Sequence, residues 1–422
     1  MPLILIVIVL VAFAGLAWRD LKLALTLILA LLPTYLLRFE VVIPWTVLEG
    51  FILIAFAIWL IKGQAQDLFL PEILGPYRAP FICLLAIATC AAIWAPDQSN
   101  ALGVWKAYFI EPVLMFVMLR STFTERADWT RALTALGLTT IAIAGFAIFQ
   151  KLTGLGLPIP WDADRRATSI FEYPNAVGLF VAPIVTAFCV VRPRLAIIAV
   201  PLGLVAVLLA KTEAALVAIP VTLLATLLMS LAPSKTKITA LVGSVVVAVA
   251  MLAIVPAVRE KVLLQDYSGE VRRAQWSETV ELLKDRPLQG AGLSGYPTIF
   301  EPYHDPTLYE IFQYPHNIIL NFWVEMGVFG IIAFIWIAIV TSKLAWIRRH
   351  DTLVLGAFAA LLTMTIHGLV DVPFFKNDLA VLTAFFLAMT LVPTSTHHLV
   401  TNHPEVTTCP ERSRRERSRR EY

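Results

Sequence analysis

Cysteine and charge are both scarce in this sequence. Only four of its 422 residues are cysteines, and charged residues make up 15% of the chain, against a hydrophobic fraction of 59%. With a mean hydropathy of +0.78, the chain is too apolar to be a water-soluble globule. Cys83, Cys90, Cys189 and Cys409 lie in apolar segments or near the C-terminus, and none lies in the one large polar segment. The sequence therefore predicts neither a disulfide framework nor a cysteine-based metal site.

Long apolar runs occupy most of the chain instead. A helix needs about 20 apolar residues to cross about 30 Å of hydrocarbon, and it satisfies its own backbone hydrogen bonds. We therefore predict an all-α fold, a polytopic transmembrane helix bundle of about 12 to 13 spans. The expected spans are 3–18, 21–37, 46–61, 80–95, 103–119, 133–150, 174–191, 195–210, 214–231, 238–256, 317–341, 353–370 and 379–393. The first run has neither a basic segment before it nor a small-residue cleavage site after it, so we expect a retained span.

The short loops predict which side each segment occupies, because their lysines and arginines stay in the cytoplasm. If the helices alternate, the basic residues of the short loops gather at one end: Arg120, Arg126, Arg131, Arg192, Arg194, Lys235, Lys237, Lys343, Arg348 and Arg349. The opposite, extracytoplasmic end then carries 38–45, 96–102, 151–173, 257–315 and 371–378. The predicted organisation is N-terminal transmembrane helices (1–256), a large periplasmic loop (257–315), C-terminal transmembrane helices (316–393) and a disordered cytoplasmic tail (394–422).

The segment YPHNIILNFWVEMGVFG (314–330) joins the large loop to an apolar run. It places His316 and Asn317 at the membrane surface, where they can meet both a lipid head group and water. Upstream, 269–284 has helical periodicity, with an apolar stripe that includes Val271 and Trp276 and continues through Val280 and Leu283. The turn-forming residues from Asp285 onward should end that helix, so the sequence predicts a partly helical loop.

Four stretches of the chain carry recognisable motifs. They are RATSIFEYPNAVG (166–178), RRAQWSETVELLKDRPLQGAG (272–292), the His-Asn start of 315–330 with its Glu-x-Gly at Glu325, and HGLVDVPFFKNDL (367–379). Together they resemble the O-antigen ligase and O-antigen polymerase superfamily, multi-spanning enzymes that move glycans from polyprenyl diphosphate carriers at the outer face of the inner membrane. The first six spans resemble it only in hydrophobic character. One stretch departs from the pattern: LAKTEAAL (209–216) has Thr212, Glu213 and Ala214 where the family shows Ser-Arg-Gly, so the arginine is missing. The neighbouring Lys211 could substitute for it only as a point charge.

The resemblance implies an O-antigen ligase-like glycosyltransferase in the bacterial inner membrane, with its active site on the periplasmic side, serving polysaccharide or lipopolysaccharide biosynthesis. The donor would be a glycan on undecaprenyl diphosphate, and the acceptor a glycan, lipid A core or protein. His316 is the expected base, with Asp371 or Glu325 to orient it, and Arg272 stabilises the leaving diphosphate. The expected substrate-binding residues are Arg273, Arg165, Arg166, Lys211, Asn317 and Lys376.

Metal, cofactor and nucleic acid are not expected, and membrane lipids are the other predicted partner. Asp162 and Asp164 form a D-x-D pattern, which binds divalent metal in many glycosyltransferases. Arginines beside them compete for the carboxylates, so a capped or salt-bridged loop is the preferred interpretation. We therefore predict a metal-independent enzyme.

Structural interpretations compete at each of these positions. The alternative for His316 and Asn317 is an interfacial side chain and a helix N-cap. For Arg272 and Arg273 it is a solvated helix face or a contact with lipid phosphate, and for Lys211 it is a surface turn. Trp276 reads as an interfacial anchor, and His367 as a partner for a neighbouring helix. Two other functions also compete: a polymerase of the same superfamily, and a transporter of polysaccharide or lipid-linked substrate, for which Pro183, Pro201 and Pro220 would break helices.

Overall fold

The computed structural model describes residues 3–41, 43–63, 71–230 and 263–394, with the single residues 239, 243 and 260. Within these ranges the chain is almost entirely helical, which confirms the predicted all-α bundle. The strands there form one antiparallel hairpin, β1 (Arg38–Val41) and β2 (Ile43–Thr46). The expected span 238–256 and most of the tail lie outside the described residues. All the helices described below belong to one compact unit, Met1–Val392.

The N-terminal helices are α1 (Leu3–Arg19), α2 (Leu21–Ala30), α3 (Val47–Ile61), α4 (Pro71–Leu74), α5 (Arg78–Ile93), α6 (Gln98–Trp105), α7 (Glu111–Thr122) and α8 (Arg126–Thr153). They are followed by α9 (Pro174–Val191), α10 (Ala196–Leu209) and α11 (Glu213–Ser230). The C-terminal part contains α14 (Tyr267–Asp285), α15 (Tyr296–Phe300), α16 (Ile318–Ile347), α17 (Thr352–His367) and α18 (Asn377–Met389). Pro183, Pro201 and Pro220 lie inside α9, α10 and α11, which continue through them instead of breaking.

Six helical segments of the described residues are long and apolar enough to cross a membrane, and six shorter apolar helices accompany them. The long segments are Glu72–Ile93, Gln98–Thr122, Arg126–Thr153, Pro174–Val191, Glu213–Ser230 and Ile318–Ile347. Large apolar side chains remain exposed on their outward faces; Ile197 and Ile339 are 82% and 60% exposed. A water-soluble monomer rarely exposes so much apolar surface, so these faces fit a lipid environment.

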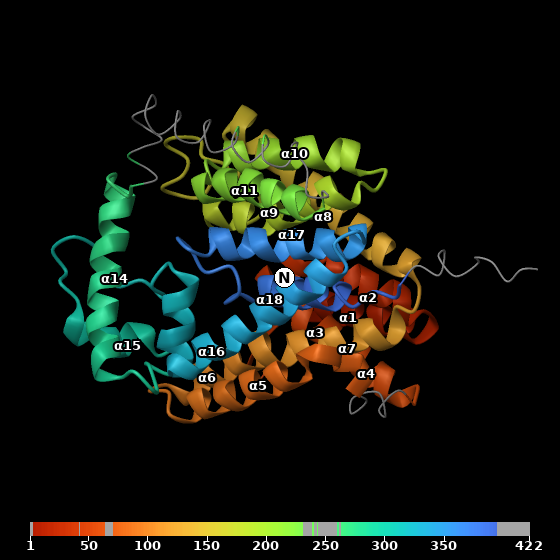
Figure 1. Ribbon diagram of the computed structural model, residues 1–422, viewed down its shortest axis with the longest axis horizontal. Helices are drawn as coiled ribbons and strands as arrows, with labels where there is room; N and C mark the ends of the chain where they lie inside the picture. Colours follow the sequence, from red (N-terminus) through yellow and green to blue (C-terminus); the bar gives the residue numbers. More distant parts are fainter. Residues whose placement is uncertain are drawn as a thin grey trace, which may run out of the picture. The chain divides into compact units, whose positions relative to one another are not determined.

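Helix α17 occupies the centre of the packing. It lies between the α9 and α11 pair on one side and α16 and α18 on the other (Figure 1). Its tightest neighbour is α9, where Gly356 allows the side chain of Val191 to approach the α17 backbone. Because α17 ends at His367, this packing fixes the position of the loop 368–376 that follows it.

Contacts between loops separate the two ends of the bundle as the sequence predicted. At one end Lys22 pairs with Asp128 at 2.7 Å, and Arg126 pairs with Asp351 at 2.7 Å. At the other end the loop after α14 meets the end of α5, where Leu293 N donates to Ala91 O. Segments predicted to share a side of the membrane therefore lie together, while the assignment of that side to the periplasm stays a prediction.

The large loop is anchored to α16 around Gly327. This glycine has a φ of +67°, and a side chain there would collide with the carbonyl of Leu288. Beside it, Glu325 accepts a hydrogen bond from Ser294 N at 2.7 Å, and Trp323 Nε1 donates to Pro287 O. The Glu-x-Gly motif thus attaches the loop to the helix, and Glu325 is occupied there instead of orienting His316.

Helix α14 confirms the helix predicted over 269–284 and ends at Asp285, where the turn residues begin. Its buried face differs from the predicted stripe. Val271 and Leu283 are buried, but Val280 is 39% exposed and Leu282 is fully covered in its place. Polar residues also contribute to this face, because Gln275 and Thr279 lie within it.

Candidate active site

His316 lies in a strained turn directly before α16. Its φ of +46° is in the left-handed region, which a histidine adopts only when its surroundings impose it. The imidazole packs between Phe312 and Tyr314, whose ring centroids are 5.2 Å and 4.9 Å away. Nδ1 of His316 is 3.7 Å from Oδ1 of Asp371, which is too long for a hydrogen bond but close enough for an ion pair once the ring is protonated.

Asp371 is the buried partner of this imidazole, with only 2% of its surface exposed. Oδ1 accepts a hydrogen bond from Val372 N at 2.8 Å, and Oδ2 accepts one from Asn175 Nδ2 at 3.3 Å. Burial by itself would raise the pKa of this carboxyl, but the interactions with His316 and His367 outweigh it and hold the pKa below its usual value. Asp371 is therefore ionised and suited to support a protonated imidazole.

Arg166 connects the loop 154–173 to this carboxylate through Asn175. Its Nη2 donates to Asn175 Oδ1 at 2.9 Å, and its Nε donates to Ala210 O at 2.7 Å. The side chain is half-buried, and this burial lowers the pKa of the guanidinium from its ordinary value. Asn175 therefore lies between Arg166 and Asp371, and both of its side-chain polar atoms are engaged.

Arg272 reaches the same region from α14. Trp276 Nε1 donates to Pro315 O at 2.8 Å and Gln275 Nε2 to Tyr314 O at 2.9 Å, so α14 is attached to the residues just before His316. Arg272 Nη1 donates to Ser268 Oγ at 3.0 Å. Its guanidinium also acts electrostatically on His367 at the end of α17. Trp276 thus has a defined hydrogen bond inside the protein.

Asn317 is the N-cap of α16. Its Oδ1 accepts hydrogen bonds from Ile319 N and Leu320 N, and its Nδ2 donates to Leu369 O at 2.9 Å. The capping interpretation therefore accounts for every polar atom of this side chain. A substrate-binding role for Asn317 stays a prediction.

Lys376 is the residue before α18, and its side chain makes no capping hydrogen bond there. It contacts Tyr173, which lies two residues before Asn175 in the sequence. Its Nζ is 4.0 Å from the centroid of the Tyr173 ring, a cation–π contact. Burial lowers the pKa of this amine to about 8, although the charges of Asp378 and Glu172 oppose the shift. Lys376 is therefore at the edge of the same site, with a weaker hold on its proton than an exposed lysine.

Three of the predicted basic residues are exposed. Arg165 and Lys211 both have left-handed backbones, with φ of +46° and +49°, and Arg273 lies on the outer face of α14. Lys211 contributes its carbonyl to Arg166 at 3.2 Å, while its side chain is at the surface. Asp162 and Asp164 are exposed as well. Among the described residues no cluster of three or more His, Cys, Asp or Glu side chains has the geometry to hold a metal ion.

Buried polar atoms without a partner concentrate around His316. Thirteen such side-chain atoms occur in the part of the chain that the structure describes, and seven belong to Arg272, Gln275, His316, Asn321 and His367. Neither ring nitrogen of His367 and neither side-chain polar atom of Asn321 is bonded, although these residues are 2% and 1% exposed. Native proteins rarely leave such groups unsatisfied, so this arrangement indicates a site for a polar ligand.

A comparison with protein families gives a match in the same part of the chain. Residues 197–335 match the family model described as O-antigen ligase. The matched segment, called the O-antigen ligase domain below, covers 139 of the 422 residues. It supports membership of the O-antigen ligase superfamily, as the motifs predicted. No curated protein matches the chain.

The O-antigen ligase domain contains only part of the site. It includes Lys211, Arg272, Arg273, His316 and Asn317, and it ends inside α16. Arg165, Arg166, Asp371 and Lys376 lie outside it, so their link to His316 comes from the fold. The family supports a glycosyl-transferring membrane protein without assigning a donor or a catalytic residue.

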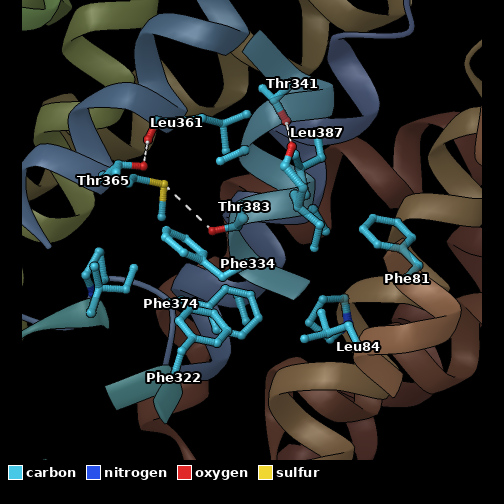
Figure 2. Close-up of a pocket in the computed structure, with 18 of the residues that line it drawn as sticks. Phe81, Leu84, Phe322, Phe334, Thr341, Leu361, Thr365, Phe374, Thr383 and Leu387 are labelled. Atoms are coloured by element: carbon cyan, nitrogen blue, oxygen red, sulfur yellow. Dashed lines mark hydrogen bonds between the residues drawn. The ribbon is translucent and has the colours of Figure 1, made fainter. Parts of the chain in front are cut away.

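An apolar cavity of about 310 Å³ adjoins the candidate site. It lies between α5, α7, α16, α17 and α18, and Figure 2 shows the rings of Phe322, Phe334 and Phe374 gathered in its wall. Ile318 and Pro373 also line it, one residue after Asn317 and two residues after Asp371. The polar cluster and the apolar cavity are therefore built by the same two segments.

The sequence did not single out Asn175 and Asn321 as site residues, and it predicted only a structural role for His367. Asn175 stood in the Pro-Asn motif, but nothing in the sequence paired it with Asp371. Asn321 carried a local signal, because an amide in an apolar span, one turn after Asn317, is costly without a partner. His367 was assigned to a neighbouring helix, whereas both of its nitrogens lack a bond within the described residues.

Proposed function

We propose that this protein is an O-antigen ligase-like glycosyltransferase that moves a preassembled glycan from undecaprenyl diphosphate to an acceptor at the periplasmic face of the inner membrane. The observation that carries this proposal is the group of buried, unpartnered polar atoms around His316 beside an apolar cavity. A lipid-linked diphosphate has the matching two-part chemistry, an anionic head and an isoprenoid chain. The ligase domain supports the same reaction class.

In the proposed reaction His316 takes the proton of the acceptor hydroxyl through the ring nitrogen that faces away from Asp371. The acceptor oxygen then forms a bond to the anomeric carbon of the donor sugar, while the bond from that carbon to the diphosphate oxygen breaks. The electron pair leaves with the diphosphate, and the proton stays on the imidazole. Asp371 stabilises the resulting imidazolium, because an ionised carboxylate lies 3.7 Å from Nδ1.

Arg272 is the proposed partner of the leaving diphosphate. Its unbonded Nε is buried within the site, and a fixed guanidinium in a low-dielectric region stabilises developing charge well. In this proposal Arg273, Arg165, Lys211 and Lys376 are further positive charges that would attract the carrier, and Asn317 lies at the helix start. Arg166 acts indirectly in this proposal, since its donors are already used to hold Asn175 and the carbonyls of Ala210 and Lys211.

The apolar cavity is the proposed place for part of the carrier's isoprenoid chain. Its lining is dominated by phenylalanine, leucine and isoleucine, and it begins beside both Asn317 and Asp371. A chain held there would bring its diphosphate toward the unpartnered polar atoms. Burial of apolar surface then contributes binding energy remote from the reacting atoms.

The decisive experiment supplies the purified protein with a polyprenyl diphosphate glycan and separate acceptors: lipid A core, the lipid-linked glycan itself and a hydroxyl-bearing protein. We expect glycan transfer to one acceptor, and that acceptor distinguishes ligase from polymerase or protein glycosyltransferase. His316→Ala should lower the rate by at least on the order of 100-fold. His350→Ala is the matched control, because His350 is exposed in the loop between α16 and α17.

A folded His316→Ala protein with an unchanged rate would refute the proposed base. Absence of transfer to every acceptor by the wild-type protein would refute the proposed reaction class. Addition of EDTA should leave the rate unchanged, and loss of activity that Mg²⁺ restores would overturn the metal-independent mechanism.

A further inference from the structure

A second pocket lies on the large loop, apart from the apolar cavity. Its volume is about 480 Å³, and it is formed by the first turns of α14 and the segment 309–312. The lining residues are Tyr267, Ser268, Val271, Tyr309, Glu310 and Phe312. Three of these six side chains are aromatic, and two of the others carry a hydroxyl and a carboxylate.

The aromatic side of this pocket is held rigidly. The rings of Tyr309 and Phe312 are stacked, with centroids 5.8 Å apart and planes 9° from parallel. The Tyr309 hydroxyl donates to Glu278, whose carboxylate also lies 3.2 Å from Nδ1 of His304. A ring fixed in this way loses little freedom when a ligand stacks on it.

Tyr267 forms the opposite, open side. Its side chain is 69% exposed, and its hydroxyl is tied to Leu308 O at 3.4 Å. An exposed aromatic residue with a fixed hydroxyl presents its ring to whatever enters the pocket. Tyr267 is therefore a residue whose removal changes the pocket without opening the protein core.

The pocket adjoins the proposed site through two of its lining residues, Phe312 and Ser268. Phe312 separates it from His316, because its ring contacts the imidazole edge to face at a centroid distance of 5.2 Å. On the other side, Ser268 receives the hydrogen bond from Arg272. A ligand in the pocket would thus lie next to His316, the proposed base for the acceptor hydroxyl, and Arg272, the proposed partner of the diphosphate.

We propose that this pocket binds a saccharide unit of one of the two glycan substrates, adjacent to the sugar that reacts. A pyranose ring has a face of C–H groups, which favours the negative face of an aromatic ring, and a rim of hydroxyl groups. Ser268 and Glu310 can accept hydrogen bonds from that rim. The carboxylate of Glu310 disfavours an anionic lipid head group at the same position. This inference rests on the proposed function, because it names the substrate class of that site.

Steady-state kinetics of the full-length protein test the proposal. Tyr267→Ala should raise the KM for either the donor or the acceptor by roughly tenfold, with kcat within a factor of two. The substrate whose KM changes identifies which glycan occupies the pocket. Tyr267→Phe keeps the ring and should preserve most of the affinity. Leu288→Ala is the matched control, since Leu288 is a 62% exposed apolar residue of the same loop that does not line the pocket.

Direct binding separates failure of this inference from failure of the proposed reaction. The probes are the free acceptor oligosaccharide and the oligosaccharide released from the donor by mild acid, measured by saturation-transfer NMR with wild-type and Tyr267→Ala protein. Binding that depends on Tyr267 in a protein without transferase activity would support the pocket and refute the reaction. Unchanged KM values for both substrates, or binding equal in both proteins, would overturn the saccharide pocket.

Discussion

Asn175 and Asp371 are 196 positions apart in the sequence, yet Nδ2 of Asn175 donates a hydrogen bond to Oδ2 of Asp371 at 3.3 Å. This bond joins the start of α9 to the loop between α17 and α18. Arg166 holds the other end of the same amide, so the carboxylate beside His316 is positioned by two separate loops. The geometry of the proposed base therefore depends on residues well outside the ligase domain.

Asp371→Asn should lower the rate of glycan transfer by on the order of 100-fold, because the neutral amide no longer stabilises a protonated His316. The variant should remain folded, since an asparagine fits the same volume. The measurement is kcat in the transfer assay, with Asp162→Asn as the control because Asp162 is an exposed carboxylate of another loop. Equal losses in both variants would contradict a specific role for Asp371.

Arg166→Lys should destabilise the protein by roughly 1 to 3 kcal/mol and reduce activity, because an ammonium group cannot donate simultaneously to Asn175 and to the carbonyls of Ala210 and Lys211. Arg165→Lys is the neighbouring control, since Arg165 is exposed. Unfolding in detergent measures the stability difference. If Arg166→Lys and Arg165→Lys have the same free energy of unfolding, Arg166 does not organise the loop.

Asn317→Ala should cost about 1 kcal/mol of stability through loss of the N-cap of α16. Asn317→Asp keeps an oxygen acceptor for Ile319 N and Leu320 N and should recover most of it. If the activities of the wild type, Asn317→Asp and Asn317→Ala fall in the same order as their stabilities, Asn317 acts as a helix cap. Activity lost in Asn317→Asp despite normal stability would instead support a substrate contact.

The pH dependence of stability tests the burial of Lys376, whose pKa is about 8 in the folded protein against about 10.4 in an unfolded chain. Between these values the unfolded state binds more protons, so the contribution of this group to stability rises with pH from about 8 to about 10.4. The Tm of the wild-type protein should therefore rise relative to that of Lys376→Met across this range.

Lys284→Met is the control for that series, because Lys284 is an exposed lysine whose ion pair with Glu281 is at the surface of α14. Its Tm difference from the wild type should stay flat. If the Tm difference between the wild type and Lys376→Met also stays constant with pH, the amine is solvated and keeps its ordinary affinity for a proton.

The fold class, and nearly all the helices within the described residues, could be read from the amino-acid sequence. Apolar runs and their flanking charges were sufficient, because a helix in hydrocarbon must satisfy its own backbone and this requirement is local. The start of α16 was equally readable, since Asn317 has the side chain and the position of an N-cap. The motifs led to the right superfamily for the same reason: each is a short, contiguous pattern.

The folded structure was needed to show which polar residues meet. It brought Asn175 and Asp371 to the histidine turn, left Arg165, Arg273 and Lys211 at the surface, and directed Glu325 to the loop instead of to His316. These outcomes depend on the packing of α9 and α17 and on the attachment of α14 to the residues before α16. Such contacts join segments far apart in the chain, and no periodicity or local motif specifies the distance between them.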